Sequence, residues 1–305
     1  MAGFTDTVDR DLDSLARAAP RKQPRSLARI LSSAFLIVIM IIVSLGMILP
    51  YEWTFTSAFK PDKDIFRYAY PISWKTFWPP NPTIQNFVKV FRDWKFGRNL
   101  MNSLIAAVLQ MTGTLVVSSL AAFTLTRVRW KASGFVFALI MLVALVPFEV
   151  IIVPLYVVVR TLGWTRSFLV LFVPWIASPF GIFQLRQAFI EIPKDFDEAA
   201  MIEGAKPFQI FWYVILPNAK SSLVTLALMS FLASWNSFMW PLIALQDVSK
   251  QVIQVAIATF SLPYNDPAWG AIFAGATLGT VPVLILFIAL QRYYVRSAVM
   301  SGLKG

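Results

Sequence analysis

The chain has 305 residues, of which 57% are hydrophobic and 14% are charged, and its mean hydropathy is +0.65. A soluble domain carries about 25% charged residues, so this composition indicates a membrane protein. Cysteine and histidine do not occur, which excludes disulfides, thiol nucleophiles and the acid–base or metal chemistry of histidine. The formal charge of +11 does not indicate a nucleic-acid partner, because Lys and Arg lie between apolar runs. We therefore expect a non-catalytic membrane protein without a metal site.

Six segments are each apolar for about 20 residues, the length that a helix needs to cross a bilayer. They predict an all-α, polytopic fold with spans at residues 30–51, 99–125, 133–158, 167–188, 219–245 and 268–291. The first segment follows a charged stretch and no small-x-small cleavage site follows it, so we interpret it as a retained span. One membrane domain at 30–291 is thus expected between an N-terminal extension at 1–29 and a tail at 292–305.

The distribution of Lys and Arg predicts the orientation of these spans. Of the 27 basic residues, 16 lie in the segments on one side of the membrane, which are 1–29, 126–132, 186–220 and 291–305. Eight of the other 11 lie in one long loop at 52–98, and long loops influence topology little. We therefore expect both termini, and the loop between the fourth and fifth spans, on the cytoplasmic side.

The long outer loop at 52–98 has an amphipathic pattern. After Thr83, a candidate N-cap, apolar residues recur at helical spacing at Ile84, Phe87, Val88 and Phe91. This predicts a short helix at the outer surface. Three nearby tryptophans fit an interfacial aromatic belt or, alternatively, a docking surface for an extracytoplasmic partner: Trp74, Trp78 and Trp94.

The loop between the fourth and fifth spans contains residues that typically begin and end helices. Asp195 and Glu198 have the spacing of a capping box, so a helix should begin near Phe196 and end at Gly204, which adopts a left-handed turn without steric cost. A second helix should begin at Lys206-Pro207 and end at Pro217. Its predicted apolar face comprises Phe208, Phe211, Trp212 and Ile215. The pattern predicts a helix–turn–helix projection outside the membrane.

This loop resembles the EAA loop of permease subunits of ATP-binding-cassette (ABC) importers. The likeness is carried by Glu198-Ala199-Ala200, by Gly204 and by Val214-Ile215-Leu216-Pro217, with Val214 where isoleucine is common. It implies that the loop at 193–217 is a coupling element that seats in a groove of an ATPase subunit. The ATPase-coupling residues that it implies are Glu198, Ala199, Ala200, Gly204, Leu216 and Pro217.

Other segments resemble the carbohydrate-uptake, MalG-type branch of these permeases. They read TSAFKP, RNLMNSL, VPFEVIIVPLY, SWNSFMWPLI and SGLKG. The resemblance implies a type I ABC importer permease fold in a bacterial or archaeal cell membrane, and a sugar or oligosaccharide as substrate. Glycerol-phosphate permeases share much of the sequence of these segments, so glycerol-3-phosphate or its diesters stay an alternative substrate class. The C-terminal SGLKG resembles tails that reach toward the ATPase.

The resemblance also implies partners. No G-x-x-x-x-G-K-[ST] phosphate loop occurs in the sequence, so we expect no cofactor on this chain, with ATP and Mg²⁺ on a partner ATPase. The implied assembly contains two ABC ATPase subunits, a second permease subunit and an extracytoplasmic substrate-binding protein in a lipid bilayer, without nucleic acid. Small residues recur every four positions in the last span, at Ala271, Gly275 and Gly279, and predict close packing of another helix, from this chain or from its partner.

Polar groups within the predicted spans are the candidates for the substrate path. They are Glu149, Ser230, Ser234, Trp235, Asn236 and Ser237. Intramembrane acids favour a functional interpretation, but serines also join helices by hydrogen bonds, and Trp235 or Trp240 could either stack on a sugar ring or pack between helices. A secondary transporter stays an alternative, although it usually needs more buried ionisable residues than this chain offers. A channel would need rings of charge or a carbonyl filter, for which no segment is evident.

Overall fold

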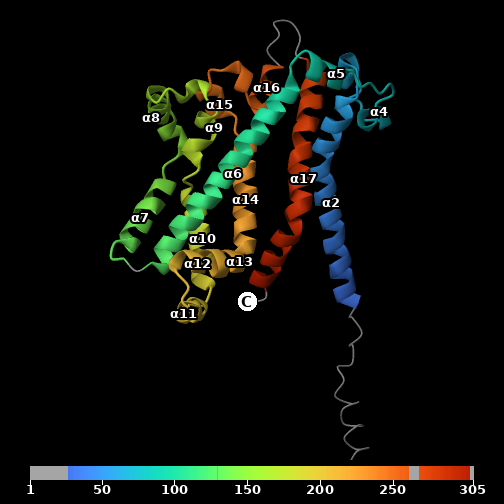
Figure 1. The fold of residues 1–305 in the computed structure, drawn as a ribbon. Coiled ribbons are helices and arrows are strands. Elements are labelled where there is room, and N and C mark those ends of the chain that lie inside the picture. The colour runs from blue at the N-terminus through green and yellow to red at the C-terminus, as the bar shows by residue number, and fades with distance from the viewer. Residues whose placement is uncertain (1–26, 129, 261–267, 303–305) are drawn as a thin grey trace, which may run out of the picture. The chain divides into compact units, whose positions relative to one another are not determined.

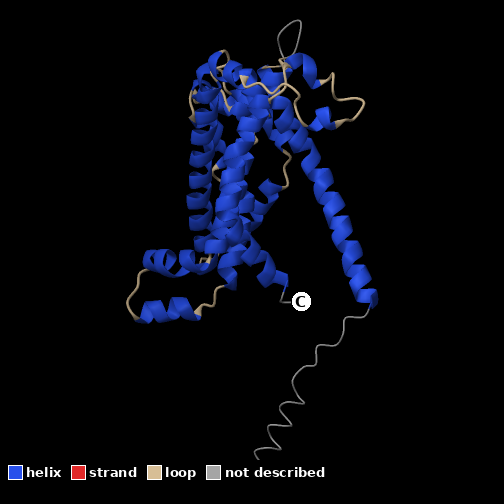
Figure 2. Ribbon diagram, turned by 90° about the vertical axis from the view of Figure 1, so that its right-hand side faces the viewer, coloured by secondary structure: helices blue, strands red, loops and turns tan. Residues whose placement is uncertain are grey.

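The computed structural model describes residues 27–128, 130–260 and 268–302 (Figure 1). Most of the predicted extension at 1–29 and the last three residues of SGLKG lie outside them. The regular structure of the described residues is entirely helical (Figure 2), which confirms the all-α prediction. The chain divides into two compact units, residues 1–52 and 53–305. Helix α2 (Leu27–Ala58) begins in the first unit and ends in the second.

Three continuous helices are long and apolar enough to cross a membrane. They are α2, which contains the candidate span Leu31–Ala58; α6 (Phe96–Arg127); and α17 (Trp269–Gly302), which contains the candidate span Trp269–Gln291. They confirm the first, second and sixth predicted spans. The helix α17 continues through most of the predicted tail at 292–305.

The third and fourth predicted spans are broken helices. The third consists of α7 (Ser133–Ala144) and α8 (Phe148–Thr161), which meet at 101°. The fourth consists of α9 (Leu169–Phe172) with the 3₁₀ turn η2 (Val173–Trp175), and then α10 (Pro179–Glu191), with a bend of 43°. The expectation of continuous helices was wrong here, because a proline at each break lacks an N–H donor and disfavours helical backbone in the residue before it.

The fifth predicted span is also interrupted. Helix α14 (Lys220–Trp235) ends before residues 236–238, and α15 (Met239–Ala244) follows. The segment before α14 meets it at 81°. Counting each bent pair as one span gives up to six spans by length and composition.

Short helices occur in the loops that the distribution of basic residues predicts on the extracytoplasmic side; we call this end of the protein the outer end and the end with the 193–217 loop the inner end. They are α3 (Asp62–Ile65), α4 (Trp74–Phe77), α5 (Gln85–Arg92), η1 (Trp164–Arg166), η4 (Val248–Lys250) and α16 (Ile253–Thr259). Helix α5 confirms the helix predicted in this loop. The predicted N-cap was wrong, because Ile84 occupies the N-cap position and no side chain caps the helix; the Thr83 hydroxyl accepts a hydrogen bond from Gln85 N–H at 3.2 Å from one position earlier. Asn86 and Val90 are buried, whereas Ile84, Val88 and Phe91 of the predicted apolar face are exposed, as a helix at the outer surface allows.

The three tryptophans predicted for the outer interface lie in different surroundings. Trp74 and Trp78 are exposed, as either an aromatic belt or a docking surface requires. Trp94 packs on Phe260, with 4.6 Å between ring centroids. Trp94 therefore belongs to the packed core of the outer end.

Helix α6 packs against α10 and α14, and α14 packs against α17. Glycines allow the closest approaches. A Cβ at Gly181 of α10 would lie 2.7 Å from the Ser118 hydroxyl of α6. Cβ atoms at Gly275 and Gly279 would lie 3.2 Å from Ile257 and Ile253, so α16 of the same chain packs on the ridge predicted in the last span.

Candidate functional site

The 193–217 loop begins with helix α11 (Asp195–Ile202). Its end has the geometry of a Schellman motif: Ala205 N–H donates to Ala200 O at 2.9 Å and Gly204 N–H to Met201 O at 3.0 Å. Gly204 has φ +87°, as this motif requires and as the sequence predicted.

The predicted capping box at the start of α11 was wrong. Lys194 occupies the N-cap position, and no side chain caps the helix. Asp195 lies one position too late for that role, inside the first turn. The exposed Glu198 has no hydrogen-bond or ion-pair partner among the described residues, so its carboxylate is available to a group outside the chain.

The second arm of the loop begins where the sequence predicted. Helix α12 (Pro207–Ile210) has Pro207 in its first turn, and Lys206 N–H donates to the Gln209 side-chain oxygen at 2.8 Å. A π-helical segment η3 (Phe211–Ile215) and α13 (Leu216–Asn218) continue this arm.

Pro217 does not end this arm, contrary to expectation. It lies within α13, and the chain turns only at Ala219, before α14. The predicted apolar face is divided between the interior of the protein and its surface. Phe211 and Ile215 are buried, whereas Phe208 and Trp212 are exposed.

A hydrophobic cluster anchors the second arm to the membrane helices. Ile210, Phe211 and Ile215 pack with residues of α6 and α10 that include Phe123 and Leu185. The rings of Phe211 and Phe123 lie edge to face, with centroids 5.2 Å apart. Leu216 is half-buried beside this cluster. Movement of the second arm is thus coupled by packing to α6 and α10.

The opposite surface of the loop is apolar and exposed. Large apolar side chains that are more than half exposed are Phe196, Met201, Ile202, Phe208, Trp212 and Tyr213. Between the arms lies a hollow of about 310 Å³ whose lining includes Gly204, Gln209 and Tyr213. Glu198 and Ala199 are exposed and Ala200 is half-buried. Exposed apolar side chains gathered on one loop mark a site of interaction with a partner or with the bilayer surface.

A buried ion pair connects α11 to the inner end of α6. Arg127 Nε lies 2.8 Å from Asp197 Oδ2, and the two side chains are 6% and 8% exposed. The N–H at Nε is not aligned for a hydrogen bond, so the attraction is that of an ion pair. Arg127 Nη2 donates to Ile192 O at the end of α10, at 2.8 Å. The sequence analysis missed this pair, since 70 residues separate its members and no local pattern joins them.

Burial raises the pKa of Asp197 above its ordinary value, against the lowering effects of Arg127 and Lys194. A carboxyl group with a raised folded-state pKa contributes stability at low pH, and that stability is lost as the pH rises through the folded pKa. Ionised Asp197 therefore costs folding free energy at neutral pH. The pair is more useful for fixing geometry than for stabilising the fold.

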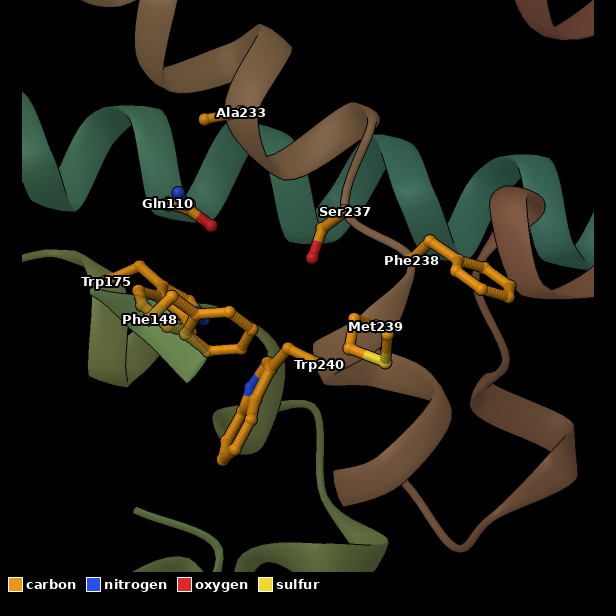
Figure 3. Close-up of a pocket in the computed structure, with 8 residues that line it drawn as sticks. All are labelled: Gln110, Phe148, Trp175, Ala233, Ser237, Phe238, Met239 and Trp240. Carbon is orange, nitrogen blue, oxygen red and sulfur yellow. The ribbon is translucent and has the colours of Figure 1, made fainter. Parts of the chain in front are cut away.

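A second candidate site is a cavity of about 300 Å³ at the broken helices. Its lining comprises Gln110, Phe148, Trp175, Ala233, Ser237, Phe238, Met239 and Trp240 (Figure 3). Phe148 lies edge to face with Trp175 at 5.5 Å between centroids, and Trp175 lies edge to face with Trp240 at 5.8 Å. The breaks that the sequence analysis missed thus bring three aromatic rings from three segments to one cavity.

Two polar groups face these rings. Figure 3 shows Gln110 of α6 and Ser237 of the 236–238 break pointing toward the space beside the rings. Gln110 is 7% exposed, and its amide makes no hydrogen bond to any other described residue. The amide borders the cavity, so it can form hydrogen bonds with a polar ligand there. The sequence analysis missed Gln110, although it is the only glutamine in the second predicted span.

The other predicted substrate-path residues are dispersed. Trp235 is buried between α14 and α17, where Nε1–H donates to Gly279 O at 3.1 Å. Ser230 is buried within α14, and Asn236 and Glu149 are exposed. Ser234 does not line the cavity either. Ser237 is therefore the one predicted substrate-path residue, of six, that lines it. Trp240 has a packing role as well, since Nε1–H donates to Val170 O at 2.8 Å.

Comparison with protein families gives one match over most of the chain. The family model described as "Binding-protein-dependent transport system inner membrane component" matches residues 114–299. This range contains the whole 193–217 loop and all lining residues of the cavity except Gln110.

Curated relatives and a solved structure agree with this match. The chain is 29% identical to the arabinooligosaccharides transport system permease protein AraQ of Halalkalibacterium halodurans, over 89% of this chain and 94% of the relative. It is 31% identical to the diacetylchitobiose uptake system permease protein DasC of Streptomyces coelicolor, over 88% and 96%. A crystal structure of a bacterial ABC transporter involved in alginate import contains a chain with TM-score 0.77 and 20% identity, over 90% of this chain and 100% of that one. The last likeness shows the fold.

Proposed function

This chain belongs to the family of binding-protein-dependent transport system inner membrane components, and from this premise we propose that it is a permease subunit of an ATP-driven importer for a sugar or oligosaccharide. It is a multi-pass membrane protein, with up to six spans among its described residues. The importer would move its substrate by alternating access, with this chain forming one half of the path.

The observation that carries this proposal is the construction of the 193–217 loop. One surface of the loop is apolar and exposed, while the second arm is packed into α6 and α10. A loop with both properties can accept force from a partner and pass it to the membrane helices. We assign the partner as an ATPase subunit, with Glu198, Ala199, Ala200 and Gly204 at the contact. Leu216 and Pro217 belong to the arm that connects the contact to α14.

The proposed complex has two ATPase subunits, a second permease subunit and an extracytoplasmic substrate-binding protein. ATP and Mg²⁺ would reside on the ATPase subunits. The proposal places the 193–217 loop and both termini on the cytoplasmic side, as the distribution of basic residues favours.

The cavity favours an uncharged sugar over a phosphate ester. Its lining has four aromatic side chains, an amide and a hydroxyl but no Lys or Arg. A phosphate group would call for a cation or several N–H donors, whereas a sugar offers hydroxyl groups for Gln110 and Ser237 and an apolar ring face for Trp175 or Phe148. We therefore propose the cavity as a sugar contact in the translocation path.

Transport in proteoliposomes tests the proposed function. The chain would be reconstituted with candidate ATPase, second permease and binding-protein subunits from the same organism, and uptake of labelled oligosaccharides and of glycerol-3-phosphate would be measured with and without ATP. We expect uptake of an oligosaccharide that requires both ATP and the binding protein. Uptake that persists without ATP would indicate a secondary transporter, and selective uptake of glycerol-3-phosphate would overturn the sugar assignment.

A further inference from the structure

We propose that Arg127 is a positioning residue that connects α11 to α6 and α10 through Asp197, and that this connection is required for ATP hydrolysis to drive transport. The inference rests on the proposed function. It concerns different side chains from the apolar contact with the ATPase, because Arg127 and Asp197 are buried where α6, α10 and α11 meet.

Helix α11 has little apolar packing of its own. Asp197 is the one buried residue in α11, whereas the second arm places Ile210, Phe211 and Ile215 in the hydrophobic cluster. The first arm is therefore held to the membrane helices chiefly by a charge pair, together with the half-buried Ala200.

Arg127 is placed to connect three helix ends. It is the last residue of α6, it donates to Ile192 O just after α10, and it pairs with Asp197 in the first turn of α11. A cation at the carboxyl ends of two helices and an anion at the amino end of a third each have the favourable sign for the helix dipole. The arginine fork can keep both contacts at once, which a lysine amine cannot do with the same geometry.

The energetic character of the pair argues for a positional role. A buried ion pair can often be replaced by apolar side chains of similar size without loss of stability, whereas removal of one partner leaves a buried charge and is strongly destabilising. Stability alone would therefore not require this pair. Its directional contacts fix how α11 is oriented against α6. A displacement of α11 by the ATPase would therefore be transmitted to α6.

The double substitution Arg127→Met with Asp197→Leu tests this role in the full reconstituted complex. It removes both charges together, so we expect assembly and ATP hydrolysis to remain while the amount of sugar imported per ATP hydrolysed falls about tenfold. Lys89→Met is the matched control, because Lys89 pairs with Asp62 at 3.6 Å in an exposed ion pair at the outer end. It should leave the ratio unchanged.

A second variant keeps the test decisive if the double variant does not assemble. Arg127→Lys retains the charge but cannot reproduce both contacts, and we expect it to lower the same ratio severalfold in an assembled complex. A wild-type ratio in either assembled variant would overturn the proposal. Wild-type uptake that needs no ATP would instead overturn the proposed function, so the two failures are distinguishable.

Discussion

The two ends of the second unit, residues 53–305, are held together by different forces. At the outer end, buried side chains donate hydrogen bonds to backbone carbonyls of distant segments. Asn86 donates to Ala58 O and Lys60 O, and Asn102 donates to Ser249 O and Gln251 O. At the inner end, the 193–217 loop exposes apolar side chains and is connected by a hydrophobic cluster and one buried ion pair.

This difference indicates different mechanical roles. Many directional bonds between short segments make the outer end a rigid cap, because each buried polar group must keep its partner. The inner end has a stiff loop with an open apolar surface, which suits an element that a partner moves as one body. Substitutions at the outer end should therefore affect stability, and substitutions at the inner end should affect coupling.

The largest effect is expected from Gly204→Val. Gly204 has φ +87°, and no atom lies within 4 Å of an added Cβ, so the substitution strains the backbone without a clash. A left-handed conformation costs an L-residue about 1–2 kcal/mol, and more for a β-branched one. The turn between the arms should change, and ATP-driven uptake should fall by about tenfold or more.

Gly163→Val is the matched control for that substitution. Gly163 also has a positive φ, +72°, and open space around its Cβ, but it lies before η1, far from the 193–217 loop in sequence. Uptake should be close to wild type in the assembled Gly163→Val complex. Equal losses in the two variants would show that backbone strain, rather than the position of the loop, causes the defect.

A stability effect is expected from Asn86→Leu at the outer end. The side chain is 2% exposed, and its amide donates to Ala58 O and Lys60 O at 2.9 and 2.8 Å. The leucine side chain would offer no donor to these two carbonyls, and the loss of such buried hydrogen bonds costs about 1–3 kcal/mol. Thermal unfolding should show the loss, with coupling unchanged in protein that remains folded. Gln85→Leu, in an exposed position of the same helix, should have little effect; reduced coupling in Asn86→Leu would contradict the division of roles.

A smaller effect is expected at the cavity. Gln110→Leu removes an amide that we assign to a sugar hydroxyl, and one neutral hydrogen bond contributes about 1 kcal/mol. The maximal uptake rate should fall about fivefold while ATP hydrolysis persists. Asn236→Leu, an exposed amide beside the cavity, serves as the control, and unchanged uptake in Gln110→Leu would remove the cavity from the proposed path.

The smallest effect is expected at Asp247 in the outer loop. Hydrogen bonds from Ser249 and Lys250 lower the pKa of Asp247 to about 2. The stability from these bonds is present above the ordinary carboxyl pKa of about 3.9 and is lost as the pH falls toward about 2. The unfolding temperature of the wild type should therefore fall more steeply over this range than that of Asp247→Asn. If the unfolding temperatures of the two proteins fall in parallel as the pH is lowered, the hydrogen bonds to Asp247 do not stabilise the folded state relative to the unfolded state.

Local features of this fold were predictable from the sequence. Runs of apolar residues indicated the continuous helices α2, α6 and α17, and Gly204 with Pro207 indicated where one arm of the loop ends and the next begins. These features depend on neighbouring residues, whose spacing is visible in the chain.

Features that depend on distant contacts were not predictable. The sequence analysis missed the breaks in the third and fourth spans although prolines lie at them, and the sequence does not give the angle of either bend. Arg127 and Asp197 meet only because α6 and α11 do, and Gln110 is indistinguishable in sequence from an amide that bonds a neighbouring helix. The burial of Asn86 in α5 was not foreseen either, because the amide donates to Ala58 O and Lys60 O, which lie 28 and 26 residues earlier in the chain.

Surface labelling of the 193–217 loop tests the central claim most directly. The chain has no cysteine, so Ile202→Cys places a single thiol at a side chain that is 88% exposed, and Val248→Cys does so at an outer side chain that is 77% exposed. With a membrane-impermeant maleimide, we predict that the Ile202→Cys variant reacts only in inside-out vesicles and is protected by the ATPase subunits, while Val248→Cys reacts only from the opposite side. Reaction of Ile202→Cys from the outer side, or at an equal rate with and without the ATPase, would contradict the account.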